Sequence, residues 1–82
     1  MTPKQRERLA RTPLGQAKNR LRAALEITEQ RQVDVCRATG IPAPNLSEIV
    51  NGRYEDLNLK TCQRLAQHFD VTVDVLFPSR AA

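Results

Sequence analysis

Residues 32–52 read QVDVCRATGIPAPNLSEIVNG, and they carry the clearest signals of secondary structure in the chain. Gly40 lies between two runs of residues whose apolar side chains recur at helical spacing. Glycine readily adopts the left-handed backbone conformation that often ends a helix, so we expect a helix over residues 32–39 to stop at Gly40. The inward side of that helix is expected to hold Val35, Cys36 and Thr39.

Two prolines fix the start of the next helix. Proline is tolerated only in the first turn of a helix, where the amide hydrogens have no partner within the helix. Pro42 and Pro44 therefore predict a start at about Pro42 or Ala43, and the pair Asn51-Gly52 predicts the end. The apolar residues between these limits have the spacing of one buried helix face, and they are Leu46, Ile49 and Val50.

Three further helices are predicted on either side of this stretch. Thr12 followed by Pro13 is typical of a helix start, since threonine caps free amide groups and proline suits the first helical position. That helix is expected to run to about residues 26–28. Asn58 is expected to cap a fourth helix that ends at Asp70, and a last short helix covers residues 73–77. The apolar stripe of the first helix is Leu14, Ala17, Leu21, Ala24 and Leu25.

The length and composition favour a single helical domain. A chain of 82 residues corresponds to one domain, and its apolar side chains are mostly aliphatic, with no Trp, two Phe and one Tyr. We therefore predict an all-α, five-helix domain over residues 12–78. A basic N-terminal arm over residues 1–11, flexible or partly helical, precedes it, and a short tail over residues 79–82 follows it.

The positive charge is concentrated near the N-terminus. Residues 1–22 hold seven basic side chains and one acidic one, Glu7, whereas residues 23–82 hold six basic and eight acidic side chains. Such a segment attracts phosphate-rich polymers or anionic surfaces, although a solvated face that only aids solubility is an equal alternative. The basic residues of the arm are Lys4, Arg6, Arg8 and Arg11, and those that follow are Lys18, Arg20 and Arg22.

Several other classes of protein are disfavoured. No apolar segment suggests a signal peptide or a membrane span, so we expect a cytoplasmic protein with reduced thiols. Cys36, Cys62 and His68 lack the paired spacing of a zinc site, and the cysteines fit small core positions. No pairing of a nucleophile with a base is visible. We expect no catalytic residue, no metal and no cofactor.

Two short helices joined through a glycine turn have the geometry of the helix-turn-helix. In this geometry the second helix of the pair projects far enough to enter a major groove about 12 Å wide. The order of residues across 32–52 resembles the Xre family, of the lambdoid phage repressor and Cro type: an initial Gln, Gly followed by an apolar residue, an apolar-Ser-x-Ile run, and Asn-Gly. The resemblance extends over about residues 14–78 and implies a regulator that binds double-stranded DNA at the nucleoid.

The resemblance also implies roles for single residues. Gln32, at a helix N-terminus, would contact a phosphate. Pro42 stands where the family prefers Ser or Thr, so one usual phosphate contact is expected to be missing. The expected base-reading residues are Ala43, Pro44, Asn45, Ser47 and Glu48. The further expected phosphate contacts are Lys18, Arg20, Arg22, Asn51, Gly52 and Arg53, with the arm residues as additional contributors.

This base-reading set is poor in the side chains that most often make bidentate base contacts. Ala43 and Pro44 can touch only apolar groups such as a thymine methyl, and Glu48 can accept from cytosine N4. Alternatively, the first two merely start the helix and Glu48 is a solvated charge. We therefore expect specificity to depend partly on DNA shape, and affinity to depend on phosphates and the arm.

Two positions depart from a pairing that the family often has. In the family, an Arg on the first helix often forms an ion pair with a Glu near the end of the third helix. In this sequence Leu25 and Val50 occupy the matching positions. We expect an apolar contact instead, which is often neutral or stabilising relative to a buried ion pair.

A module of this size is expected to bind a two-fold operator as a homodimer. We expect the dimer surface to include Val73, Leu76, Phe77 and the loop before Asn58. Two alternatives to an operator-binding regulator remain open. In the first, the protein is an antitoxin whose arm binds a toxin while the domain regulates its own operon. In the second, it is an architectural protein that binds DNA of any sequence.

Overall fold

The computed structural model describes residues 1–78, and within that range it contains helices and no strands. The all-α prediction is confirmed, with six helices where five were expected. The tail predicted over residues 79–82 lies outside the described residues. In chain order the helices are α1 (Pro3–Arg11), α2 (Leu21–Ile27), α3 (Gln32–Thr39), α4 (Ala43–Val50), α5 (Leu59–Phe69) and α6 (Val73–Leu76).

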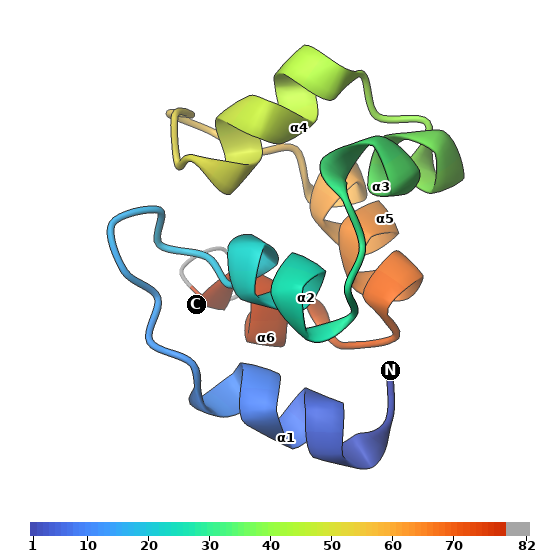
Figure 1. Cartoon of the computed structure of the whole chain (residues 1–82). Helices are drawn as coiled ribbons and strands as arrows, with labels where there is room; N and C mark the ends of the chain where they lie inside the picture. The colour runs from blue at the N-terminus through green and yellow to red at the C-terminus, as the bar shows by residue number, and fades with distance from the viewer. Residues whose placement is uncertain (79–82) are drawn as a thin grey trace.

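One apolar core joins all six helices. Helix α3 packs against α4 and α5, α5 packs against α6, and α1 packs against α2 and α6. Helix α4 lies at the top of Figure 1 and α1 at the bottom, with the core between them. The largest buried side chains are Phe69, Phe77, Leu9, Leu21, Leu46, Leu65 and Leu76.

The first predicted helix is shorter than expected. Residues 12–20 form a loop, and α2 begins at Leu21 rather than after Thr12. Gly15 and Lys18 have positive φ angles of 68° and 60°, which a helix does not accommodate. Arg20 is the N-cap of α2 and makes no side-chain cap, but the Oδ1 of Asn19, one residue earlier, accepts from the Leu21 amide at 3.0 Å. The buried face of α2 still includes the predicted residues Leu21, Ala24 and Leu25.

The N-terminal arm, expected to be flexible or partly helical, contains a helix over residues 3–11. The Thr2 hydroxyl accepts from the Gln5 amide at 3.2 Å, while the Gln5 side chain accepts from the Thr2 amide at 2.9 Å. This reciprocal capping satisfies two amide groups that a helix start leaves free. Leu9 is fully buried in the core, so a single apolar side chain anchors the helix.

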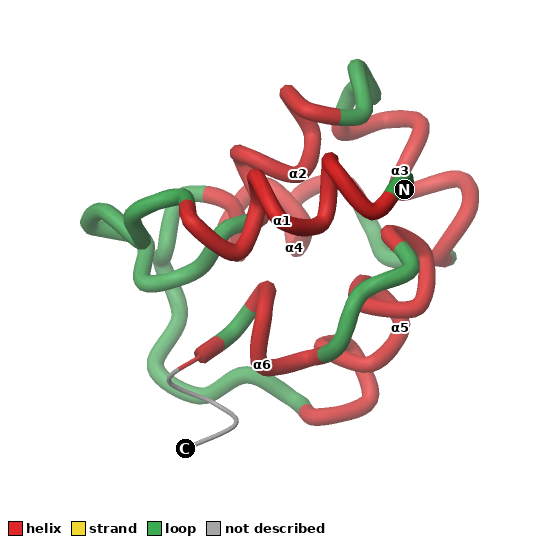
Figure 2. The backbone as a smooth tube through the Cα atoms, turned by 90° about the horizontal axis from the view of Figure 1, so that it is seen from below, coloured by secondary structure: helices red, strands yellow, loops and turns green. Residues whose placement is uncertain are grey.

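Polar contacts complete the attachment of α1. Gln5 Nε2 donates to the Ile27 carbonyl at 3.4 Å, and Arg6 pairs with Asp70 at 3.5 Å. Arg20 donates to the carbonyls of Thr12 at 2.7 Å and Val75 at 2.8 Å, which ties the end of α1 to α6. Figure 2, seen from below, shows α1 lying across the underside of the molecule.

The last helix lies inside the molecule rather than on a dimer surface. Asp70 adopts a left-handed conformation with a φ of 57° and turns the chain back after α5. Leu76 and Phe77 are then 0% and 1% exposed in the core, and Val73 is half-buried. The prediction that Leu76 and Phe77 form the dimer surface is therefore wrong, because the domain needs both residues to close its own core.

Candidate nucleic-acid interface

Helices α3 and α4 form the predicted helix-turn-helix. Gly40 has a φ of 77° and donates its amide hydrogen to the Cys36 carbonyl at 2.9 Å, which ends α3. The Thr39 hydroxyl also bonds back to the Val35 carbonyl at 2.6 Å. Ile41 is buried directly after the turn, and this fixes the direction in which α4 leaves.

The two sides of α4 differ as the helical spacing predicted. Leu46, Ile49 and Val50 are buried. The residues expected to read bases lie on the opposite side, where Ala43, Pro44, Asn45 and Glu48 are exposed and Ser47 is half-buried. A helix with one side fixed in the core and the other open has the form that major-groove reading requires.

A polar chain connects α4 to α2. Arg22 Nη2 donates to Asn51 Oδ1 at 2.8 Å. Asn51 Nδ2 in turn donates to the Ser47 carbonyl at 2.9 Å and approaches the Ser47 hydroxyl at 3.4 Å. Leu25 and Val50, the residues expected to replace an ion pair, are both buried in the common core. The same two helices are therefore joined by an apolar layer and by an exposed polar bridge.

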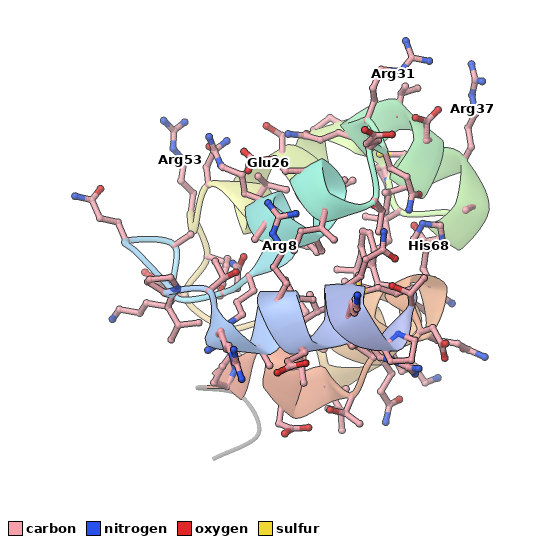
Figure 3. All side chains as sticks on the ribbon, turned by 60° about the horizontal axis from the view of Figure 1, so that its bottom comes forward. Arg8, Glu26, Arg31, Arg37, Arg53 and His68 are labelled. Atoms are coloured by element: carbon pink, nitrogen blue, oxygen red, sulfur yellow. The ribbon has the colours of Figure 1, made fainter. Side chains whose placement is uncertain are left out.

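The turn after α4 presents Asn51, Gly52 and Arg53 at the end of the helix. The Gly52 amide donates to the Ile49 carbonyl at 3.1 Å, and the Arg53 amide donates to the Glu48 carbonyl at 2.8 Å. Arg53 is exposed, and in Figure 3 it projects toward the upper edge of the view together with Arg31 and Arg37. These three cations therefore extend away from α1, which lies below them in that view.

The start of α3 carries both a predicted phosphate contact and a carboxylate. Gln32 is the first residue of the helix and is half-buried. Asp34 Oδ2 accepts from the Arg31 amide at 2.9 Å and lies 3.6 Å from Arg31 Nε. The backbone hydrogen bond from Arg31, assisted by the charges of Arg31 and Arg37, lowers the pKa of Asp34 below its usual value of 3.8. Arg31 and Arg37 therefore offset a negative charge that would otherwise repel DNA.

The other predicted phosphate residues lie in different surroundings. Lys18 is exposed on the loop between α1 and α2. Arg20 is half-buried, and its guanidinium group is hydrogen-bonded to two backbone carbonyls, as described for α1, so it has a structural role. Arg22 is exposed and lies beside Asn51. Of these three, Arg22 is the residue that the structure brings next to α4.

The basic residues of α1 do not share a surface with α4. The two helices lie on opposite sides of the molecule in Figure 1, and in Figure 2 α1 is in front while α4 is behind. Two of the four cations are also partnered by acids, Arg6 by Asp70 at 3.5 Å and Arg11 by Glu7 at 2.7 Å. A single duplex held against α4 would therefore not extend to α1.

Several residues that the structure places near this surface were not among the predicted DNA contacts. Arg31 and Arg37 flank the predicted phosphate contact Gln32, and Val33 is 41% exposed beside it. Their proximity to Gln32 in the sequence was an available signal. Asn19 and Tyr54, which bond to each other at 3.2 Å, carry no such signal because 35 residues separate them.

Among residues 1–78 no group of three or more His, Cys, Asp or Glu side chains is placed to hold a metal ion. No helix in the same range has both the length and the apolar character needed to cross a membrane.

Comparison with known families agrees with this geometry. Residues 18–77 match the model of the Cro/C1-type helix-turn-helix DNA-binding domain, a range that begins after α1 and contains α2 to α6. Searches among curated proteins and among solved structures give no match. Since the matched range covers most of the chain and includes the α3–Gly40–α4 unit, the protein belongs to the Cro/C1-type helix-turn-helix DNA-binding domain family.

Proposed function

We propose that this protein is a sequence-specific transcription regulator of the Cro or repressor type, with α4 in the major groove of a two-fold operator. The observation that supports this most directly is the exposed side of α4, whose other side is fixed in the core. Phosphate-binding groups lie at the start of α3 and after α4. Such a protein would act at the nucleoid in the cytoplasm.

In this proposal the base contacts are few and differ in kind. Glu48 accepts from a cytosine N4 amino group, and Ala43 and Pro44 pack on thymine methyl groups. Asn45 and Ser47 offer adaptable polar groups. Because none of these side chains is Arg, Lys or Gln, sequence preference depends strongly on the Glu48 contact and on the shape of the operator.

The phosphate contacts are proposed to lie on both sides of the groove. Gln32 and the start of α3 hold one strand, and Asn51, Gly52 and Arg53 hold the other. Arg22 adds a cation beside Asn51, to which it is bonded at 2.8 Å. These contacts supply the part of the affinity that does not depend on sequence and that falls as salt is raised.

Selection of bound sites from random duplex DNA tests the proposal. The expected result is a recurring two-fold motif whose half-sites lie about one helical turn apart. Glu48→Ala should change the base preferred at one position of each half-site, whereas Lys4→Ala, on the far side of the molecule, should leave the motif unchanged. Recovery of unrelated sequences bound with equal affinity would support an architectural protein instead.

A second candidate function is supported by the position of α1. This helix lies outside the range matched to the family and on the side away from α4, so its outer face stays open when α4 is on DNA. An antitoxin has this requirement, because it holds a toxin and its operator together. Co-purification with the product of an adjacent gene, weakened by substitutions on α1 and not by Glu48→Ala, would favour this function.

A further inference from the structure

We infer that Asn19 and Tyr54 are positioning residues, which hold the turn at residues 51–53 in the orientation that places Asn51 and Arg53 on a DNA phosphate. The inference rests on the proposed function of that turn. Neither residue belongs to the helix-turn-helix itself, since Asn19 lies before α2 and Tyr54 lies after Gly52.

Asn19 is a buried polar side chain, 4% exposed, whose amide group is fully used. Its Nδ2 lies 2.9 Å from the Ile49 carbonyl and 3.2 Å from the Tyr54 hydroxyl, and its Oδ1 accepts from the Leu21 amide at 3.0 Å. An amide NH2 has two hydrogens, and three acceptors lie within reach of it: the Ile49 carbonyl at 2.9 Å, and the Tyr54 hydroxyl and the Ala17 carbonyl at 3.2 Å each. The Tyr54 hydroxyl then donates to the Ala17 carbonyl, 3.4 Å away.

These hydrogen bonds add polar links between parts of the chain that also meet in the apolar core. The Ile49 carbonyl belongs to the last turn of α4, and the Leu21 amide belongs to the first turn of α2; groups at such positions have no partner within their own helix. Asn19 accepts from the Leu21 amide and donates to the Ile49 carbonyl, which also accepts from the Gly52 amide at 3.1 Å, so one side chain bonds to both helix ends. Tyr54 lies in the segment that follows Arg53, and its hydroxyl bonds to Asn19 and to the Ala17 carbonyl. The turn is therefore held at its start through Ile49 and at its end through Tyr54.

Gly52 shows how closely the turn lies against the loop before α2. It has a φ of 73°, and a Cβ atom placed there would lie 2.6 Å from the Ala17 Cα. The backbones of residues 17 and 52 are therefore in direct contact. Asn19 and Tyr54 both donate to the Ala17 carbonyl beside this contact, at 3.2 Å and 3.4 Å, and together they hold the turn against the loop.

The hydroxyl of Tyr54 can be removed with little effect on the core. Tyr54 is half-buried, and its ring packs against the core in Tyr and Phe alike. The Asn51–Arg53 turn, by contrast, has exposed side chains and depends on its backbone bonds and on this polar contact for its position. Loss of the hydroxyl should therefore change DNA binding more than it changes folding.

The test measures the affinity of Tyr54→Phe for duplex DNA across a series of salt concentrations. We expect a threefold to tenfold loss on selected and random sequences alike, roughly what one hydrogen bond contributes. The slope of log affinity against log salt should fall by about 0.9, the value for one lost phosphate contact. Thermal unfolding should show a folded protein, and Lys4→Ala should leave the slope unchanged.

A double variant separates positioning from simple destabilisation. Arg53→Ala combined with Tyr54→Phe should bind no more weakly than Arg53→Ala alone, because the hydroxyl acts through the turn. Faster hydrogen exchange of the Arg53 amide in Tyr54→Phe, without DNA, would report the released turn directly.

The possible failures are distinct. Normal affinity and slope for Tyr54→Phe, or additive losses in the double variant, would overturn the inference while leaving the proposed function intact. Absence of DNA binding by the unaltered protein would overturn both.

Discussion

At the scale of single residues, hydrogen-bond direction defines what α4 can offer to a base. Arg22 has only donors, so Asn51 must face it with its oxygen, at 2.8 Å, and turn its amino group toward Ser47. The Ser47 hydroxyl oxygen then accepts from Asn51 at 3.4 Å. That assignment leaves the hydroxyl hydrogen of Ser47 for a base acceptor. By fixing the orientation of Asn51, Arg22 leaves the Ser47 hydroxyl as a hydrogen-bond donor. The other residues proposed to read bases offer few donors.

Asp34 provides a prediction about pH at the same scale. The Arg31 backbone amide stabilises its charged form, so the folded-state pKa lies below the usual 3.8. A lowered pKa means that the carboxylate stabilises the fold at pH values above 3.8, and that this stabilisation is lost as the pH falls through the folded-state pKa. The carboxyl carbon shift of Asp34 should titrate below 3.8. Asp34→Asn should lower stability near neutral pH and approach the unaltered protein in acid; an equal difference at every pH would contradict the assignment.

At the scale of elements, local signals predicted five helices, which correspond to α2 to α6, and gave residues 3–11 only as part of a flexible or partly helical arm. Gly40, Pro42 and Asn58 act through their own backbone or cap, so the bounds of α3, α4 and α5 could be predicted from neighbouring residues. The same spacing predicted which side of α4 is exposed. Residues 12–20 contradict a good local start signal because Asn19 bonds to Ile49, 30 residues away. The bridge from Arg22 to Asn51 spans 29 residues and likewise has no local signature.

Residues 3–11 were predicted only as a flexible or partly helical arm, because one buried leucine does not form an apolar stripe. If Leu9 anchors α1 as the structure indicates, Leu9→Ala should lower the free energy of unfolding by about 2–4 kcal/mol, the usual effect of truncating a buried leucine. Lys4→Ala on the exposed side of the same helix should change it by no more than about 0.5 kcal/mol. Urea unfolding measures both. A flexible arm would instead show no effect of Leu9→Ala on stability. If Leu9→Ala lowers DNA affinity by more than its fraction of unfolded protein explains, α1 has a direct role in binding.

At the scale of the whole molecule, the core and the surfaces left open restrict how two copies meet. Leu76 and Phe77 close the core of one copy and are not available to a second. The surface proposed for a dimer therefore moves to the loop before Asn58 and the start of α5. Leu59 lies there and is 47% exposed. This region directly follows the turn at residues 51–53 in the chain.

Two aspartate substitutions distinguish these surfaces. Leu59→Asp puts a charge on the proposed contact between copies, so light scattering should show a monomer while circular dichroism shows an intact helical fold. Leu76→Asp puts a charge into a fully buried site, and burial of an unpaired charge should unfold the domain rather than merely separate the copies. The isolated Leu59→Asp monomer should still bind a single half-site, but more weakly than the dimer binds the full operator, because each copy then binds alone. A dimer that persists in Leu59→Asp would place the interface on another face, and the outer face of α1 would then be the first to examine.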